Sequence, residues 1–304
     1  MSVVAIVQAR MGSTRLPGKV LMDLAGRPML AHVIHRAAAI HGVDQVVVAT
    51  TTAPQDQPIL RQAPRWGAIP FAGSEADVLD RFYHAARSIQ AAVIVRITAD
   101  CPLLDPDVSS AVLAHFFRQE ADYATNTQPP TFPDGLDTEV LSFAALERAW
   151  REAVLPSERE HVTPYLWKHP DRFRLANLAA SVDHAALRWT VDEPQDLAFV
   201  RAIYARLYQS GRRPFGMADV LALLAREPAL QHQNAGFARN AGYYRSVQHD
   251  HGAAAGLAGA RHVGEPLAGL PYAAPAPHAA PPAGRGRAGH GPAAEASAGT
   301  GDRP

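Results

Sequence analysis

The chain has 304 residues, which suffices for one large domain or two modest ones. Its 29 basic and 29 acidic side chains cancel, and this balance argues against broad electrostatic binding to nucleic acid or to an anionic membrane. The single cysteine, Cys101, excludes an internal disulfide and a cysteine-based zinc site. The first apolar run is too short for a signal peptide and no run of about 18 apolar residues follows, so we expect a cytoplasmic protein without a membrane partner.

The first half of the chain predicts strands that alternate with helices. Apolar and β-branched runs, which are typical of central parallel strands, occupy residues 3–8, 45–50 and 92–97. Apolar residues at helical spacing indicate helices over 27–40 and 74–89. This alternation predicts a doubly wound α/β sheet with three layers, in which ligands bind at the carboxyl ends of the strands.

The helix starts in this half carry capping residues. Ser74 is the expected N-cap of the second helix, with Asp77 three residues later. Asp105 and Asp107 flank a proline and are expected to cap a third helix, which ends near Gln119. Such caps support the α/β interpretation.

The second half is less regular. A loop over 125–141 is rich in proline, glycine and acidic residues and is too long for a plain connection, which indicates a functional role. Further strands are indicated at 172–180 and 187–191, and a helix begins at Pro194. After about residue 248 the chain is mostly Ala, Gly and Pro, and we expect this tail to be disordered.

The loop QARMGSTRLPGK, which follows the first strand, is glycine-bearing and cationic. Its three cations are Arg10, Arg15 and Lys19. It is not a P-loop, because five residues separate its glycines and no Ser or Thr follows Lys19, and it lacks the G-x-G-x-x-G pattern of dinucleotide-binding folds. Cations together with backbone amides around Gly12 and Ser13 suit a polyphosphate. The alternative is a solvated basic turn.

Several short blocks of the sequence follow one another in a characteristic order. They are VQARMGSTRLPGKVLMDLAGRPMLAHVI, GSEADVLDRF, VRITADCPLLDP, PDGLDTEV, REHVTPYL, LRWTVDEPQDL and NAGYYRSV. Together they resemble the sugar cytidylyltransferase superfamily of CMP-sugar-acid synthetases, in particular its spore coat polysaccharide biosynthesis protein F type. The resemblance covers residues 1 to about 248.

The resemblance implies a domain organisation. A Rossmann-like, GT-A-like α/β nucleotidyltransferase domain would span 1–232, with an acceptor-binding and dimerisation insertion at 126–186. Residues 233–248 would form a C-terminal family extension, followed by the disordered tail at 249–304.

The resemblance also implies the reaction and the site. The enzyme would transfer CMP from CTP to a sugar or sugar acid and release pyrophosphate, with Mg²⁺ as cofactor, and would act as a homodimer in polysaccharide or glycan biosynthesis. Asp100 and Asp192 would bind the metal, although an aspartate after a strand is more commonly a cap or turn former. The nucleotide would be held by Ala9, Arg10, Gly12, Ser13, Arg15, Lys19, Ser74 and Arg81, with Lys19, Arg15 and Asp100 as catalytic residues.

The acceptor would be held by two polar blocks, Asp134, Gly135, Asp137 and Glu139 in one, and Glu158, Arg159 and His161 in the other. The residues alone fit an acidic loop and a capped surface helix equally well, and the resemblance favours the acceptor site. We interpret Cys101, which adjoins Asp100, as a packed thiol rather than a nucleophile, since no base accompanies it in the sequence.

Two alternatives from other functional classes stay open. A metal-dependent GT-A-type glycosyltransferase would usually show a D-x-D triplet, which ADCPLLD lacks. A non-catalytic nucleotide-sugar-binding module would be expected to have lost a metal ligand, whereas both aspartates are present.

Overall fold

A seven-stranded sheet forms the centre of the fold in residues 1–232, 234, 239, 242–248 and 250, which are the residues that the computed structural model describes. The strands are β1 (Val3–Gln8), β4 (Gln45–Thr51), β5 (Ile69–Gly73), β6 (Val93–Thr98), β7 (Tyr123–Thr125), β8 (Glu139–Ser142) and β9 (Leu175–Asn177). Their order in the sheet is β5-β4-β1-β6-β8-β7-β9. Strands β5, β4, β1 and β6 run parallel to one another, as the sequence predicts for a doubly wound fold.

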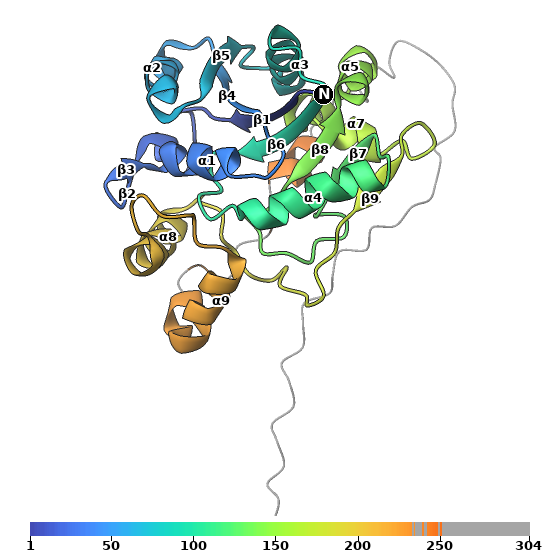
Figure 1. Cartoon of the computed structure of the whole chain (residues 1–304). Helices are drawn as coiled ribbons and strands as arrows, with labels where there is room; N and C mark the ends of the chain where they lie inside the picture. Colours follow the sequence, from blue (N-terminus) through green and yellow to red (C-terminus); the bar gives the residue numbers. More distant parts are fainter. Residues whose placement is uncertain (233, 235–238, 240–241, 249, 251–304) are drawn as a thin grey trace, which may run out of the picture. The chain divides into compact units, whose positions relative to one another are not determined.

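Helices cover both faces of this sheet (Figure 1). They are α1 (Met29–Ala38), α2 (Gln57–Gln62), α3 (Val78–Ser88), α4 (Pro106–Arg118), α5 (Phe143–Glu152), α6 (Pro156–His161), α7 (Pro164–Trp167), α8 (Pro194–Leu207) and α9 (Met217–Arg226). Short 3-10 helices span Lys19–Leu21, Pro54–Asp56, Ala63–Trp66 and Pro228–His232, and β2 (Asp23–Leu24) pairs with β3 (Arg27–Pro28). Helices α1, α4, α8 and α9 share one hydrophobic core, whereas α3, α5 and α7 share the other. The predicted three-layer arrangement is confirmed.

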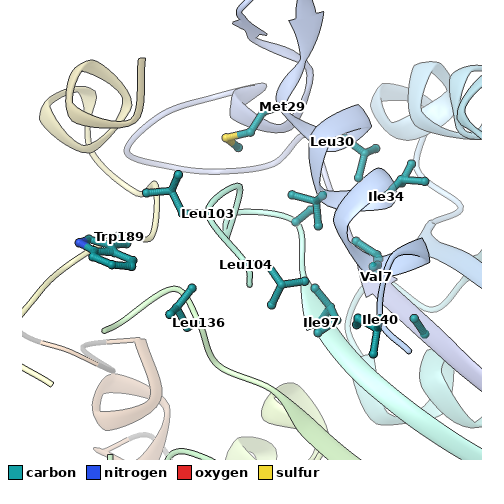
Figure 2. Close-up of a cluster of buried hydrophobic side chains, with 14 of the residues drawn as sticks. Val7, Met29, Leu30, Ile34, Ile40, Ile97, Leu103, Leu104, Leu136 and Trp189 are labelled. Atoms are coloured by element: carbon teal, nitrogen blue, oxygen red, sulfur yellow. The ribbon is translucent and has the colours of Figure 1, made fainter. Parts of the chain in front are cut away.

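The central strand β1 is buried on both faces. Apolar residues occupy both sides of the strand: Val3 and Val7 point into the core beneath α1, part of which Figure 2 shows, whereas Val4 and Ile6 point into the core beneath α3. Full burial of such a side chain contributes about 1.5–3 kcal/mol to stability. Strand β1 is therefore a firmly held element, and the cationic loop leaves from its end.

Strand β8 runs antiparallel to both of its neighbours, β6 and β7. Its first residue, Glu139, pairs with Arg96 near the end of β6. The loop 126–138, which leads into β8, therefore arrives at the edge of the sheet where β6 ends and Asp100 follows. The reversed strand brings the predicted acceptor loop to the predicted metal residue.

The helix caps agree with the sequence only in part. Asp105 is the N-cap of α4 and accepts hydrogen bonds from the first-turn amides. Asp107, which the sequence also predicts as a cap of α4, lies in the first turn of that helix and forms an ion pair with Arg213. The N-cap of α3 is Asp77, which accepts a hydrogen bond from the amide of Asp80 (2.8 Å). The prediction of Ser74 as this cap is wrong, because the Ser74 hydroxyl accepts from the amide of Asp77 (3.0 Å) and so caps the turn before the helix.

Residues 187–191 do not form the strand that their apolar character predicts. The amide of Trp189 donates to the carbonyl oxygen of Asp134 (2.6 Å), and the amide of Val191 donates to that of Asp100 (2.8 Å). These partners are loop residues, so the segment is fixed at the sheet edge without joining the sheet.

The described residues contain no helix that is long and apolar enough to cross a membrane. Of the predicted disordered tail, 249–304, only Asp250 is among the described residues.

Candidate active site

Lys19 lies between two carboxylates at the carboxyl edge of the sheet. Its Nζ atom donates hydrogen bonds to Asp100 Oδ2 (3.0 Å), Asp192 Oδ1 (2.8 Å) and the carbonyl oxygen of Val191 (2.7 Å). The Lys19 side chain is 9% exposed, whereas those of Asp100 and Asp192 are 29% and 25% exposed. One ammonium group thus neutralises two carboxylates from distant segments, and both carboxylates remain partly accessible.

The electrostatics of this contact favour the charged forms. Burial by itself lowers the pKa of Lys19, but the carboxylates of Asp100 and Asp192 raise that pKa above its usual value. Burial by itself raises the pKa of Asp100, but the Lys19 ammonium holds it below its usual range. Lys19 and Asp100 therefore remain a charged pair at neutral pH.

The loop 9–18 folds back on itself around Met11. The carbonyl oxygen of Met11 accepts hydrogen bonds from the amides of Ser13 (2.9 Å) and Gly18 (3.0 Å). Gly18 has a φ of 70°, in the left-handed region that favours glycine. Gly12 is exposed, and a Cβ atom there would meet no other atom within 4 Å. The loop thus presents an accessible backbone turn next to Lys19, where an anion can approach.

Arg15 joins this loop to the carboxylates. Its Nη2 atom is 3.3 Å from Asp192 Oδ1 and its Nη1 atom is 2.7 Å from Glu193 Oε1. The Arg15 side chain is 38% exposed. Lys19 and Arg15 therefore supply a buried and an accessible cation to the same place.

A second basic group, Arg81, lies close enough to Arg10 of the loop to be influenced by its charge. Arg81 of α3 is buried, and its Nη1 donates to the carbonyl oxygen of Ser74 (2.8 Å), while its Nε has no hydrogen-bond partner among the described residues. Burial, together with the nearby charge of Arg10, lowers the pKa of Arg81 to about 10. The structure thus brings Arg10, Ser74 and Arg81 together. The hydrogen bonds of Lys19 given above do not include these three residues.

Cys101 is buried directly after Asp100. Burial and then the Asp100 charge raise the pKa of the Cys101 thiol well above its usual value. A nucleophilic cysteine needs the opposite shift, so the environment agrees with a packed thiol.

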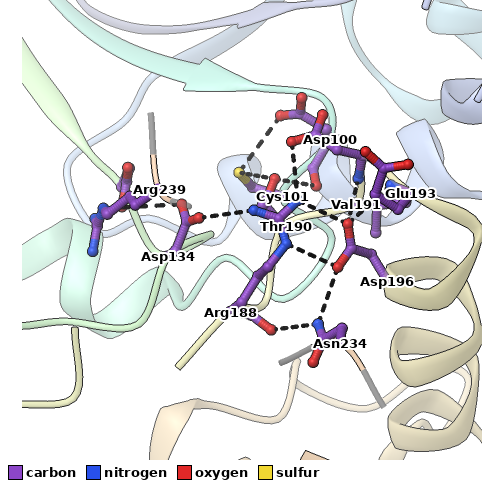
Figure 3. A network of polar contacts seen from close by, with 12 residues as sticks. Asp100, Cys101, Asp134, Arg188, Thr190, Val191, Glu193, Asp196, Asn234 and Arg239 are labelled. Carbon is purple, nitrogen blue, oxygen red and sulfur yellow. Dashed lines mark hydrogen bonds and ion pairs between the residues drawn. The ribbon is translucent and has the colours of Figure 1, made fainter. Parts of the chain in front are cut away.

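Arg188 is the centre of a further polar network, which Figure 3 shows. Its Nε and Nη2 atoms donate to Asp196 Oδ1 (2.9 Å) and Oδ2 (2.8 Å), Nη2 is 3.2 Å from Asp192 Oδ2, and Nη1 is 3.4 Å from Asp134 Oδ2. Although burial lowers the pKa of Arg188, the hydrogen bonds and charge of Asp196, followed by Asp134 and Asp192, raise it. A permanent cation therefore links Asp192 to Asp134.

The predicted acceptor loop faces a second arginine, Arg239. The Nη2 atom of Arg239 donates to Asp137 Oδ1 (2.5 Å), and its Nε atom is 4.0 Å from Asp134 Oδ1. Burial, with help from Asp134 and Glu139 and against the charge of Arg239, raises the pKa of Asp137 to about 7. Gly135 has a φ of 111°, and a Cβ there would lie 2.6 Å from the backbone of Trp189, so only glycine fits.

The carboxylate of Glu139 has three side-chain partners. Its carboxylate forms an ion pair with Arg96 and accepts hydrogen bonds from the hydroxyls of Tyr123 (2.6 Å) and Thr163 (2.5 Å). The charge of Glu139 lies close enough to influence Asp137 and His161. It therefore borders the acceptor loop while supporting the sheet.

The second predicted acceptor block has local partners. Glu158 is 3.3 Å from Lys168 Nζ, Arg159 Nε donates to Asp77 (2.8 Å), and His161 Nε2 is 3.0 Å from the Ser246 hydroxyl. None of these contacts within the described residues joins the block to Lys19, Asp100 or Asp192. The structure thus groups this block with α3 and with the helical residues 242–248.

The sequence-based set lacks five residues of the site: Arg188, Glu193, Asp196, Asn234 and Arg239. Arg188 interrupts the apolar run LRWTV, and a buried arginine needs a carboxylate partner. The sequence therefore contains a signal for Arg188. Asn234 donates to the carbonyl oxygen of Arg188 (2.8 Å), and neither it nor Arg239 lies in a recognisable pattern.

Comparisons with known proteins identify the family. Residues 4–210 match the cytidylyltransferase family. An uncharacterized protein of Methanocaldococcus jannaschii is 32% identical over 82% of this chain and 100% of its own length, and the spore coat polysaccharide biosynthesis protein SpsF of Bacillus subtilis is 34% identical over 73% and 94%. The solved structure of a cytidylyltransferase from Leptospira borgpetersenii aligns with a TM-score of 0.73 and 29% identity, over 79% of this chain and 100% of that one. The chain therefore belongs to the cytidylyltransferase family and is a nucleotidyltransferase.

Proposed function

We propose that this enzyme transfers CMP from CTP to a hydroxyl group of a sugar or sugar acid and releases pyrophosphate, in the biosynthesis of a surface polysaccharide or glycan. The observation that carries the proposal is the Lys19 ammonium between Asp100 and Asp192, since it joins the cationic loop to two carboxylates. The similarity to a spore coat polysaccharide biosynthesis protein supports an acceptor of the sugar class.

The triphosphate of CTP would be bound by the loop 9–18 and its flanking cations. Arg15 and Lys19 would contact phosphate oxygens, because charge-assisted hydrogen bonds to phosphate are strong and both cations lie at the loop. Ala9, Arg10, Gly12 and Ser13 would line the phosphates, and Ser74 and Arg81 would shape the pocket for the base.

Asp100 and Asp192 fit a Mg²⁺ ion. In the described part of the chain, no group of three or more His, Cys, Asp or Glu side chains is placed to hold a metal by itself. Mg²⁺ does not require such a group, because it is usually bound through one or two carboxylates together with substrate phosphates and water. When bound, it would neutralise charge on the α-phosphate and on the departing pyrophosphate.

The acceptor hydroxyl would attack the α-phosphorus in line. A new oxygen–phosphorus bond forms as the bond from the α-phosphorus to the bridging oxygen of pyrophosphate breaks, and the proton of the hydroxyl would pass to a nearby carboxylate or to solvent. Lys19 and Arg15 would balance the charge on the leaving pyrophosphate. Acceptor hydroxyls would be oriented by the acceptor-side residues Asp134, Gly135, Asp137, Glu139, Glu158, Arg159 and His161, with His161 positioning rather than transferring a proton.

Pyrophosphate release tests this function. The purified protein with Mg²⁺ is given each of the four NTPs together with a panel of sugars and sugar acids. We expect release with CTP and with one class of acceptor. A glycosyltransferase, which uses a nucleotide sugar as donor, and a non-catalytic binding module would both release no pyrophosphate in this assay. Absence of release with every NTP would therefore overturn the proposal.

We further propose that the enzyme is a homodimer and works in the cytoplasm, where CTP is made. Light scattering of the purified protein tests the dimer, and fractionation of the producing cells tests the location. A monomer in solution, or activity confined to another fraction, would contradict these proposals.

A further inference from the structure

Among the carboxylates around Arg188, that of Asp196 makes the shortest contacts. Asp196 receives two N–H groups of Arg188, at 2.9 and 2.8 Å, and the Asp196 side chain is fully buried. Asp196 also accepts hydrogen bonds from the amides of Asp192 and Glu193, both at 2.9 Å, at the start of α8. The Asn234 side chain donates to the Arg188 carbonyl oxygen and to Asp196. These contacts fix the plane of the Arg188 guanidinium relative to the start of α8.

The same guanidinium extends to two carboxylates of the proposed site. Its Nη2 atom is 3.2 Å from Asp192 Oδ2, while the other oxygen of that carboxylate accepts from Lys19. Its Nη1 atom is 3.4 Å from Asp134 Oδ2, while the other oxygen of Asp134 faces Arg239. Figure 3 shows Arg188 with Asp134 on one side and Asp196 on the other. Arg188 thus touches one carboxylate of the nucleotide side and one of the acceptor side.

We propose that Arg188 is a positioning residue that orients Asp192 toward the nucleotide-bound metal and Asp134 toward the acceptor, so that the two half-sites are coupled through one guanidinium. The inference rests on the proposed function and deepens it. Anchoring alone needs only Asp196, which already satisfies two N–H groups. The planar fork lets one side chain hold three carboxylates in fixed directions, which a lysine, as a point charge, cannot do.

The positive charge of Arg188 and its orientation of Asp192 have opposite effects on metal binding. Removing a positive charge next to Asp192 would strengthen cation binding, because it removes a repulsion. A substitution that keeps the positive charge but removes the planar guanidinium would weaken cation binding, because the Asp192 carboxylate would no longer be held in a fixed direction. Arg188→Lys isolates the second effect.

The experiment measures CTP binding to the full chain by calorimetry, without acceptor, as Mg²⁺ is titrated and in EDTA. We expect R188K to raise the Mg²⁺ concentration for half-maximal CTP binding by about 10- to 100-fold, the usual effect of losing a group that orients a metal ligand. CTP binding in EDTA should be unchanged, since Lys19 and Arg15 remain. The control is Arg206→Lys on α8, whose exposed partner is Glu227 and which should change neither value.

The coupling is tested with Asp134→Asn. In the wild-type background this substitution should raise the Mg²⁺ half-saturation by about threefold or more, and in the R188K background it should add little, because interacting residues are non-additive. An R188K protein with a lower melting temperature but an unchanged Mg²⁺ half-saturation would overturn the positioning role and leave the proposed function standing. Wild-type protein that binds CTP no better with Mg²⁺ than in EDTA would overturn both. If R188K does not fold, Asp134→Asn alone decides, and no effect on Mg²⁺ half-saturation overturns the inference.

Discussion

Lys19 and Asp192 are 173 residues apart in the sequence, yet the Nζ atom of one is 2.8 Å from the Oδ1 atom of the other. The same ammonium also contacts Asp100. An incoming triphosphate would compete with these carboxylates for Lys19, and a metal would compete with Lys19 for the carboxylates. Binding of nucleotide and metal therefore has to rearrange this contact.

The first prediction concerns the two cations. Lys19→Ala or Arg15→Ala should weaken CTP binding by about 1.5–3 kcal/mol, the value of a hydrogen bond to a charged group. Only Lys19→Ala should also lower the melting temperature, because it removes a buried cation from between two carboxylates. Calorimetry and melting curves measure the two effects, with the exposed Arg65→Ala as control. Unchanged CTP affinity in both variants would contradict the proposed role of the loop.

The second prediction concerns the two aspartates. Asp100→Asn or Asp192→Asn should lower turnover by about 10²- to 10³-fold, as for the loss of an electrostatic group at the transition state. The double variant should lose little more, because the two carboxylates act on one metal. A double-substitution cycle on turnover with Mg²⁺ titrated checks this. Rate losses that simply multiply would argue against a shared metal.

The same variants have a predicted effect on stability. The sequence alone favours a neutral or mildly stabilising effect, because two like charges in an empty site repel each other. The shared Lys19 reverses this expectation for Asp100, whose pKa it holds low. A lowered pKa contributes stability that is present above the unfolded pKa and is lost as the pH falls through the folded pKa. Asp100→Asn should therefore lower the melting temperature at pH 7 and have less effect in acid.

The third prediction concerns Asp137, whose pKa is raised to about 7 chiefly by burial. A raised pKa contributes stability that is fully present below the unfolded pKa and is lost as the pH rises through the folded value. Compared with wild type, Asp137→Asn should therefore gain in relative stability as the pH rises from about 4 to 7. Melting curves of both proteins across this range check the prediction. A constant difference between the two proteins would mean that Asp137 titrates normally.

The fourth prediction concerns the C-terminal part of the chain. A chain ending after Asp250 should keep its melting temperature and activity, because the Ala, Gly and Pro composition of 251–304 cannot supply a core. A chain ending after residue 232 should lose both, since it lacks Arg239, which contacts Asp137, and Asp250, which accepts from the amide of Ser157. Comparing the two truncations by melting and by pyrophosphate release separates these parts. Full activity of the shorter chain would show that Arg239 is dispensable.

The parallel half of the fold could be predicted from the sequence because its signals are local. The run Val3–Gln8 is apolar on both faces, and the predicted strand coincides with β1. The segment 187–191 carries the same signal, yet its partners are the loops at Asp100 and Asp134. Apolar character predicts burial in both cases, whereas pairing depends on which backbone groups are free nearby.

The candidate site could be predicted only where a residue lies in a recognisable block. Lys19, Asp100 and Asp192 were expected together, and the structure brings them within hydrogen-bond distance. Arg239 could not have been placed, because its contact with Asp137 is set by tertiary packing across 102 residues. Which residues hold the substrates stays a prediction until the variants are measured.

The wide separation of Lys19 from its partners also bears on how the protein matures during synthesis. The ribosome releases the chain from the N-terminus, and a domain generally folds as a unit once its segments have been made. The loop 9–18 emerges early and Asp100 follows directly after β6, but Asp192 comes much later, so Lys19 has only one of its two carboxylate partners until the last part of the domain has been made. A nascent chain halted before Asp192 would contain all seven strands of the sheet and still lack the second carboxylate that contacts Lys19. On the proposed function, catalytic competence would therefore be one of the last properties that the growing chain acquires.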